Sequence, residues 1–435
     1  MKVILYSPQI SPRLNYIIDF LSVHIFGEPV ILTTDIAEFK NTDAIKLNYS
    51  LAEVDENEIR ISPHALLFEE GIQPQLIECF EWHRLKVFFK TEGNIPFDIF
   101  AASFYLLTRY EEYLPYEQDE YERYAHVNSL AFKENFLHLP LVNLWIEELI
   151  KLIQRNRAFR LQPLTFKFAP TYDIDIAYRY LHHSVFRNLG GYYKEILSGK
   201  WKLLKERDNV FSGSQKDPFD TYDWLASLNN QYNLEPVYFF LLAQKRKGYD
   251  KNISPHNRAM QKLIQWHAAR YTVGIHPSWQ SGDDKIMLLR EISLLEKISG
   301  KKITHSRQHY IRMNFPETYR RLINEGIKHD YSMGYGSING FRASVTLPFY
   351  WYDLEKEEKT SLLIYPFCYM EANSYFEQHY SAEKAAQELQ GYYDIVRSVK
   401  GQLITIFHNH FLTEQQQWLS WRKMYHDFLQ RNFVG

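Results

Sequence analysis

The chain has 435 residues, 45% of them hydrophobic, which is enough for two domains that each bury a sizeable core. The 50 Lys and Arg against 52 Asp and Glu give a net charge of −2, which argues against a nucleic-acid partner, and two cysteines exclude a disulfide-rich secreted scaffold. No apolar run approaches the roughly 18 residues of a transmembrane segment, and the apolar start at residues 3–6 is too short for a secretory signal, so we expect a cytoplasmic protein.

The first part of the chain, residues 1–160, mixes short strands and helices and is predicted to form a smaller α/β domain of unknown role. Strands are expected at 3–6 and 29–33, and helices at 15–26, 97–113 and 141–155. No catalytic set stands out here, and Arg109, Glu111 and Glu112 are interpreted as a solvated helix end. The basic, polar stretch 154–162, followed by Pro163, predicts the domain boundary.

The second part, residues 161–435, alternates strands with helices. Strands are predicted at 164–172, 236–242, 272–276, 303–306, 343–347, 362–368 and 403–408, and helices at 223–230, 258–270, 284–298, 316–325 and 381–399. Such alternation indicates parallel βα units. One insertion, 180–218, is too long for an ordinary loop, and its 200–205 stretch predicts an exposed helix.

Polar side chains follow several of these strands where they end, and in a βα barrel such positions converge on one site. The clusters hold Asp173 and Asp175; His276 and Trp279; Arg307, His309 and Tyr310; Asp330; Glu371; and His408 and His410. Singly, each has an ordinary structural explanation, such as a core histidine or a surface acid. Two carboxylates two residues apart on a strand point the same way and need a compensating cation, so one acid is expected to bind a metal and the other to act as general base.

Five segments, TYDID (171–175), GIHPSW (274–279), RQHY (307–310), DYSMGY…GFRAS (330–344) and FHNH (407–410), resemble the motif series of the NodB-like polysaccharide deacetylases. This superfamily, carbohydrate esterase family 4, has a distorted (β/α)7 barrel. More closely, the chain resembles the two-domain deacetylase-like proteins in which a smaller α/β domain precedes the barrel. The resemblance covers about residues 160–435 and implies a (β/α) barrel over 161–435.

The resemblance also implies roles for individual residues. It makes Asp173 the general base, Asp175 and His276 ligands of a divalent metal, most often zinc, and Arg307 the group that orients the base. His408 would protonate the leaving group, and Asp330 would support that histidine.

One departure from the family pattern concerns the third metal ligand. Gln280 stands where the family has its second metal histidine, and Pro277 replaces the usual serine or threonine. His309 is our choice for the third ligand; His305, a weakly bound Gln280, water, or a site that has lost its metal remain alternatives.

The predicted function is a metal-dependent hydrolase that removes an acyl group, N-acetyl by preference, from a carbohydrate. Substrate contacts are expected from Trp279, Tyr310, Arg342 and Glu371, although Arg342 is equally expected in a structural pair with Asp330 or Glu371. A flexible glycine-rich loop, 334–340, is expected over the barrel mouth, and further aromatic rings are expected beside the site at Tyr172, Tyr331, Tyr335 and Phe341. The alternatives are a catalytically silent carbohydrate-binding protein and a first domain that serves as a partner-binding module.

Overall fold

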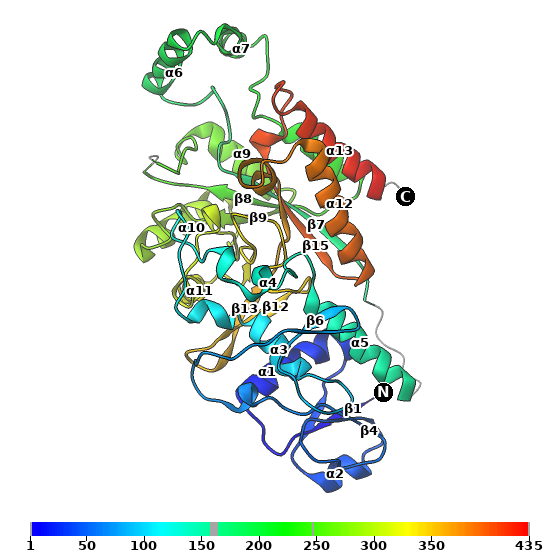
Figure 1. The fold of residues 1–435 in the computed structure, drawn as a ribbon. Helices are drawn as coiled ribbons and strands as arrows, with labels where there is room; N and C mark the ends of the chain where they lie inside the picture. Colours follow the sequence, from blue (N-terminus) through cyan, green and yellow to red (C-terminus); the bar gives the residue numbers. More distant parts are fainter. Residues whose placement is uncertain (1, 157–163, 246–247, 434–435) are drawn as a thin grey trace.

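The computed structural model describes residues 2–156, 164–245 and 248–433 and places the chain in two main, mostly parallel sheets flanked by helices, with a separate antiparallel pair of strands, β5 and β6 (Figure 1). The smaller sheet uses residues between 3 and 60, and the larger one residues between 167 and 408. The predicted α/β class is therefore confirmed. The predicted boundary near residue 160 lies outside the described residues and stays a prediction.

The smaller sheet has the strand order β2-β1-β3-β4, all parallel. Its first strand is a run of apolar, β-prone residues that is buried throughout. The hydroxyl of Ser11 caps the first helix by accepting the N–H of Leu14, and Pro12 opens it at a position that proline tolerates. The elements of this part are β1 Val3–Tyr6, α1 Pro12–Leu21, η1 Ser22–Phe26, β2 Ile31–Thr33, α2 Ile36–Asn41, β3 Ile45–Asn48, β4 Glu58–Arg60, η2 Ala65–Phe68, β5 Phe80–Trp82, β6 Leu85–Val87, α3 Ile99–Leu107, η3 Tyr110–Tyr113, η4 His126–Asn128, α4 Leu130–Lys133 and α5 Leu141–Asn156.

The larger sheet has the order β12-β13-β11-β10-β9-β8-β7-β15-β14, and only β12 runs antiparallel to its neighbour. Its elements are β7 Lys167–Ile174, α6 Val185–Leu197, α7 Trp201–Phe211, α8 Tyr222–Gln231, β8 Val237–Leu241, α9 Arg258–Ala268, β9 Thr272–His276, α10 Lys285–Ser299, β10 His305–Ser306, η5 His309–Ile311, α11 Glu317–Asn324, β11 His329–Asp330, β12 Phe349–Asp353, β13 Glu358–Ile364, β14 Tyr369–Met370, η6 Asn373–Glu377, α12 Ala382–Ser398, β15 Gln402–His408, η7 Asn409–Phe411 and α13 Leu419–Phe433. No strand pairing among the described residues joins the two ends of this sheet, so the predicted barrel is not shown.

Most predicted strands and helices of this part lie within a few residues of the observed ones. The exception is 343–347, predicted as a strand; it is a buried turn, and the antiparallel hairpin β12–β13 follows it. Val345 and Leu347 are buried among other core residues without a strand partner, which is why an apolar run there resembled a strand.

The two sheets share one hydrophobic core. Tyr16 of α1 packs against Tyr352 of β12, with ring centroids 5.0 Å apart, and the buried Arg13 pairs with Glu357 of the hairpin. The prediction of a solvated helix end at Arg109 and Glu112 is wrong. Both side chains are buried, and they are bonded to each other at 2.7 Å. Arg342, from the larger part of the chain, binds the same carboxylate, so the buried charges compensate one another.

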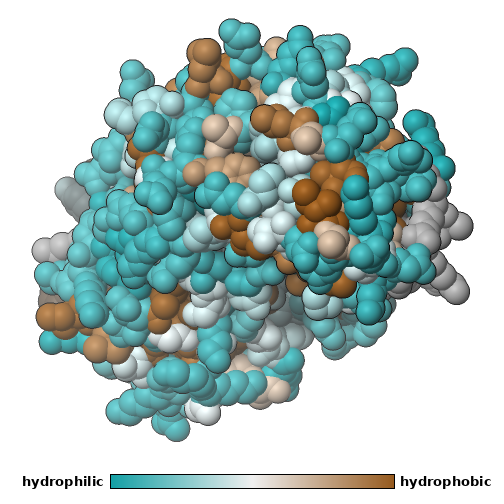
Figure 2. Space-filling model, turned by 90° about the horizontal axis from the view of Figure 1, so that it is seen from below, coloured by the Kyte–Doolittle hydropathy of each residue, from teal (hydrophilic) through white to brown (hydrophobic). Residues whose placement is uncertain are grey.

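The insertion after β7 forms the helices α6 and α7, which project from the top of the molecule in Figure 1. The predicted exposed helix near 200–205 is thus part of α7. On the opposite, lower face the surface is mostly hydrophilic, with hydrophobic side chains in small separate groups (Figure 2). Across the described residues, no helix combines the length and apolar character needed to cross a membrane.

Candidate active site

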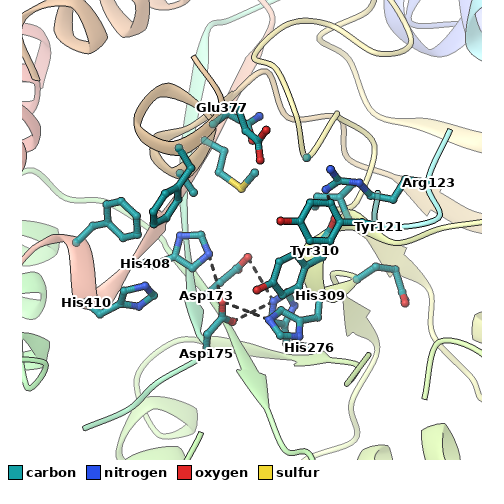
Figure 3. Close-up of a pocket in the computed structure, with 18 of the residues that line it drawn as sticks. Tyr121, Arg123, Asp173, Asp175, His276, His309, Tyr310, Glu377, His408 and His410 are labelled. Carbon is teal, nitrogen blue, oxygen red and sulfur yellow. Dashed lines mark hydrogen bonds and ion pairs between the residues drawn. The ribbon is translucent and has the colours of Figure 1, made fainter. Parts of the chain in front are cut away.

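Side chains from β7, β9, the β10–η5 turn and β15 meet at the carboxyl edge of the larger sheet (Figure 3). The strands β15, β7, β8 and β9 are adjacent, so their ends lie together as the sequence predicted for parallel βα units. The residues that line the pocket are Glu120, Tyr121, Arg123, Asp173, Asp175, His276, Gln308, His309, Tyr310, Ile311, Gly336, Met370, Ala372, Asn373, Phe376, Glu377, His408, His410 and Phe411.

Asp175, His276 and His309 form a group whose donor atoms all lie within 4.8 Å of one another. Nε2 of His276 is 3.2 Å from one carboxylate oxygen of Asp175, and Nε2 of His309 is 3.5 Å from the other. One carboxylate and two imidazoles are a ligand set that zinc and similar divalent metals accept. These three residues could therefore hold a metal ion. Gln280 is not among the residues that line the pocket around this group.

The surroundings of this group favour a metal. Nδ1 of His276 lies 2.5 Å from the carbonyl oxygen of Arg307, and Nδ1 of His309 lies 3.1 Å from the Asp250 carboxylate. Because each Nδ1 faces an acceptor, each Nε2 is the ring nitrogen that would be left to bind a metal. The Oδ1 atom of Asp175 is buried without a hydrogen-bond partner, which leaves it available for a cation.

The pKa values of Asp175 and His309 are shifted because the charged groups of this site lie close together. Burial would raise the pKa of the Asp175 carboxyl, but His309 and His276 hold it well below its usual range. Burial opposes protonation of His309, yet the carboxylates of Asp175 and Asp250 raise its pKa to about 9. A site this rich in negative charge attracts cations, whether protons or a metal.

A strained turn brings His309 and Tyr310 into the pocket. Tyr310 and Ile311 have φ angles of 58° and 56°, in the left-handed region that a β-branched residue rarely adopts. Such strain persists where surrounding contacts fix the backbone, and it gathers at functional sites. Because β10 ends at Ser306, the chain can turn here at once and direct both rings inward.

Asp173 is held by Arg307. Nη1 of Arg307 donates to Oδ1 of Asp173 at 2.9 Å and to the hydroxyl of Thr171 at 2.6 Å, and Nε donates to the Tyr331 carbonyl at 3.0 Å. The guanidinium is fully buried. These contacts fix the carboxylate with its second oxygen 3.7 Å from Nε2 of His276, beside the candidate metal group.

His408 lies on another side of the group, with Nε2 3.5 Å from Asp175. Its partner is Glu371, whose buried carboxylate accepts from the ring Nδ1 at 2.8 Å and from the backbone N–H of His408 at 2.5 Å. Burial by itself would lower the pKa of His408, but Glu371 outweighs it and raises that pKa to about 10. His408 is therefore protonated at neutral pH.

The family resemblance implied that Asp330 supports His408, but the Asp330 carboxylate has other partners. Its buried carboxylate accepts from the hydroxyls of Ser306 and Ser332, at 2.8 and 2.9 Å, and joins β10 to the turn after β11. Glu371, expected as a substrate contact, occupies the supporting position, because β14 pairs with β15 and sets Glu371 directly beside His408.

The N-terminal part of the chain contributes to the pocket through Glu120, Tyr121 and Arg123. The Tyr121 ring stacks on Tyr310 with centroids 5.1 Å apart. Arg123 donates to the Tyr310 carbonyl at 2.7 Å and is paired with Asp119. Gly336 makes room for this contact, since a Cβ there would lie 2.0 Å from Nη1 of Arg123.

Several residues expected at the pocket do not line it. Trp279 stacks on Tyr249, at 4.2 Å between centroids, behind the pocket wall. Arg342 is buried against Glu112, a third partner that neither sequence-based alternative included. His305 stacks on His329. Of the six aromatic residues expected beside the site, Tyr310 lines the pocket, whereas the others, Tyr172, Trp279, Tyr331, Tyr335 and Phe341, do not. The loop 334–340 is largely buried, and Gly336 alone of its residues lines the pocket.

Sequence reasoning missed Asp250, Tyr121 and Arg123. Asp250 lies between β8 and α9, and nothing in the neighbouring sequence marks it as a partner of His309. Tyr121 and Arg123 lie in a polar stretch without periodicity, almost 190 residues from Tyr310. Only a fold that packs the first part of the chain on the second brings them together.

Comparisons with known proteins give three results. Residues 3–158 match a family described only as a family of unknown function, DUF7033. A search of curated proteins finds no match.

Among solved structures, the chain is similar to proteins described as polysaccharide deacetylases. The one from Mycobacterium smegmatis is 15% identical, with 63% of this chain and 87% of that chain covered and a TM-score of 0.37. The one from Pseudomonas aeruginosa PAO1 is 12% identical, with 61% and 84% covered and a TM-score of 0.38. A polysaccharide deacetylase from Bacillus cereus is 10% identical, with 60% and 87% covered and a TM-score of 0.30. With scores this low, the proposals below rest on the chain's own residues.

Proposed function

We propose that this pocket hydrolyses an acyl group, N-acetyl in the first instance, from a sugar or polysaccharide with the help of a divalent metal such as zinc. The observation that carries the proposal is the separate pairing of two groups around the candidate metal ligands. Asp173 is bound to the buried Arg307, and His408 is bound to the buried Glu371. A carboxylate held by an arginine and a histidine kept protonated suit a base and an acid that work on one reaction.

Asp175, His276 and His309 would hold the metal through one carboxylate and two Nε2 atoms. When bound, a divalent metal ion supplies Lewis acidity, which lowers the pKa of a water molecule and polarises an acyl carbonyl. Asp250 and the Arg307 carbonyl keep the two histidines in the tautomer that binds metal.

Asp173 takes the proton from the attacking water in this proposal. Arg307 occupies its Oδ1 atom, while Oδ2 lies toward His276 and the pocket. His408 gives a proton to the departing amine through Nε2, since its Nδ1 is committed to Glu371. The C–N bond breaks as that nitrogen is protonated, and the products are a carboxylic acid and an amine.

The substrate would lie against the apolar lining of the pocket. This lining includes the stacked rings of Tyr310 and Tyr121 and the side chains of Phe376, Phe411 and Met370. Aromatic faces offer a sugar ring an apolar surface with polar edges nearby. Under this proposal the N-terminal part of the chain helps to bind substrate, through Tyr121 and Arg123.

The test is acetate release from an N-acetylglucosamine oligomer by the full chain, with zinc and with a chelator. We expect zinc-dependent release, and a loss of at least about a hundredfold in kcat for Asp173→Asn and for His408→Gln, in the range for a general acid or base. His305→Gln is the matched control, because this histidine lies outside the pocket, and it should retain activity.

Acetate release that survives the chelator and both variants would contradict the proposal. The alternative of a silent carbohydrate-binding protein rested on Gln280, and His309 now supplies a second histidine to the candidate metal group. Sugar binding without turnover, insensitive to chelator, would restore that alternative.

A further inference from the structure

The α6–α7 hairpin exposes an unusual number of large apolar side chains. On α6, Val185, Phe186, Leu189, Tyr193, Ile196 and Leu197 are all exposed, Phe186 at 87%, and Trp201 at the start of α7 is 68% exposed. At 100° per residue, the six positions on α6 fall on one side of the helix. The face is continuous, in contrast to the small separate hydrophobic groups on the lower face of the molecule (Figure 2).

The polar side of the hairpin is the one that is packed. Arg207 of α7 binds Glu195 of α6 at 2.6 Å and lies over the rings of Tyr180 and Tyr192. Gly191 permits this approach, since a Cβ there would lie 2.4 Å from the Arg207 guanidinium. A surface helix of a water-soluble protein ordinarily turns its apolar face inward. Here the apolar face is the outer one.

The base of the hairpin is firmly held. The Asp217 carboxylate accepts the backbone N–H groups of Arg179, Tyr180 and Leu181 at 2.9 to 3.0 Å, and Glu206 of α7 accepts from the Tyr180 hydroxyl. The hairpin follows β7, the strand that carries Asp173 and ends just before Asp175. It therefore projects from the carboxyl end of the strands, the end that bears the candidate active site (Figure 1).

Basic side chains surround the apolar face. Residues 184–211 hold six Lys and Arg against three Asp and Glu, in a chain whose net charge is −2. The acidic groups have partners within the hairpin or at its base: Glu195 with Arg207, Asp208 with Tyr192 and Glu206 with Tyr180. Lys194, Lys200, Lys202 and Lys205 are exposed, and the described residues offer them no ion-pair partner.

We propose that this hairpin is a membrane-docking element that inserts its apolar face into the interfacial region of an anionic phospholipid bilayer. Phe, Leu and Trp on one face with lysines beside them are the features of helices that lie in the membrane interface. The lysines favour an anionic bilayer as the partner, because their positive charge complements anionic headgroups, which attract polybasic segments. The proposal is independent of the reaction at the pocket.

The test is co-sedimentation of the full chain with vesicles of phosphatidylcholine alone and of phosphatidylcholine mixed with phosphatidylglycerol. We expect binding to the mixed vesicles, weakened by salt, and at least about tenfold weaker binding to the neutral ones. The variant Phe186→Ser/Leu189→Ser/Leu197→Ser should lose binding about a hundredfold or more. The variant Lys200→Gln/Lys202→Gln/Lys205→Gln should lose about fivefold for each lysine on mixed vesicles only.

The matched control is Ile286→Ser/Leu289→Ser, which removes two exposed apolar side chains from α10 and should bind as the unaltered chain does. All substituted side chains are exposed, so circular dichroism should show the same fold. The proposal is overturned if the unaltered chain does not sediment with mixed vesicles. It is also overturned if the variant Phe186→Ser/Leu189→Ser/Leu197→Ser binds these vesicles as well as the unaltered chain. A third contrary result is a dimer of the unaltered chain in light scattering that becomes a monomer in the Phe186→Ser/Leu189→Ser/Leu197→Ser variant, since a second copy of the chain would then cover the apolar face.

Discussion

The contrast between His309 and Gln280 gives the most discriminating prediction about the metal group. We expect His309→Gln to weaken zinc binding by about a hundredfold and Gln280→Ala to change it by less than about twofold. The sequence alone left both residues open as the third ligand. The structure places Nε2 of His309 3.5 Å from Asp175, whereas Gln280 is not among the residues that line the pocket.

The magnitude follows from the number of ligands. Structural zinc sites with four protein ligands gain about 10–16 kcal/mol of binding free energy, or about 3 kcal/mol for each ligand. Loss of one imidazole should therefore cost about 3 kcal/mol, which is about a hundredfold in the dissociation constant. Asp250→Asn tests the support beneath His309 and should cost about tenfold, because it keeps an acceptor near Nδ1 but removes the charge.

The assay is competition between the protein and a fluorescent zinc chelator at pH 7.5, with circular dichroism to confirm that each variant is folded. The reasoning is refuted if His309→Gln keeps the affinity of the unaltered chain, or if Gln280→Ala loses as much as His309→Gln. Either result would mean that the metal lies elsewhere or has a different third ligand.

Three further predictions concern the rest of the molecule. Gly336→Ala should displace Arg123 and raise KM for an N-acetylated oligosaccharide about tenfold, whereas Gly190→Ala, with open space around its Cβ, should not change it. Glu112→Ala should lower the free energy of unfolding in urea by about 3–5 kcal/mol, because it leaves Arg342 buried without its carboxylate partner and leaves Arg109 with Glu111 alone; a loss under about 1 kcal/mol would count against that network. Burial lowers the pKa of His267 to about 4, so between pH 6.5 and 4 the unfolded chain binds more protons than the folded one. The free energy of unfolding should therefore decrease by up to about 3 kcal/mol as the pH is lowered from 6.5 to 4, and His267→Asn should flatten that slope in urea unfolding measured across this range.

The elements of the larger sheet were predictable because strand and helix periodicities differ and each βα unit repeats the contrast. The strand from Val237 to Leu241 is a buried apolar run, and α10 has a capping Asp284 before it and Gly300 after it. The two-residue strands β11 and β14 were missed or displaced, since a pair such as His329–Asp330 has no period to detect. Their positions depend on neighbours in the sheet.

The site was predictable to the extent that its residues lie at strand ends. Asp173, His276 and His408 belong to regular strands and Asp175 directly follows one, so their sequence positions set their place at one end of the strands. Which acid supports His408 was not predictable, because Asp330 ends one two-residue strand, Glu371 follows another, and only the order β15-β14 distinguishes them. The burial of Arg342 was equally hidden, since its partner Glu112 is 230 residues away.

The most direct test of the metal centre is anomalous diffraction from crystals of the full chain grown with zinc. We predict one strong anomalous peak at about 2.0–2.2 Å from a carboxylate oxygen of Asp175 and from Nε2 of both His276 and His309. No peak among these three side chains, at zinc concentrations where the protein binds zinc in solution, would contradict the central claim.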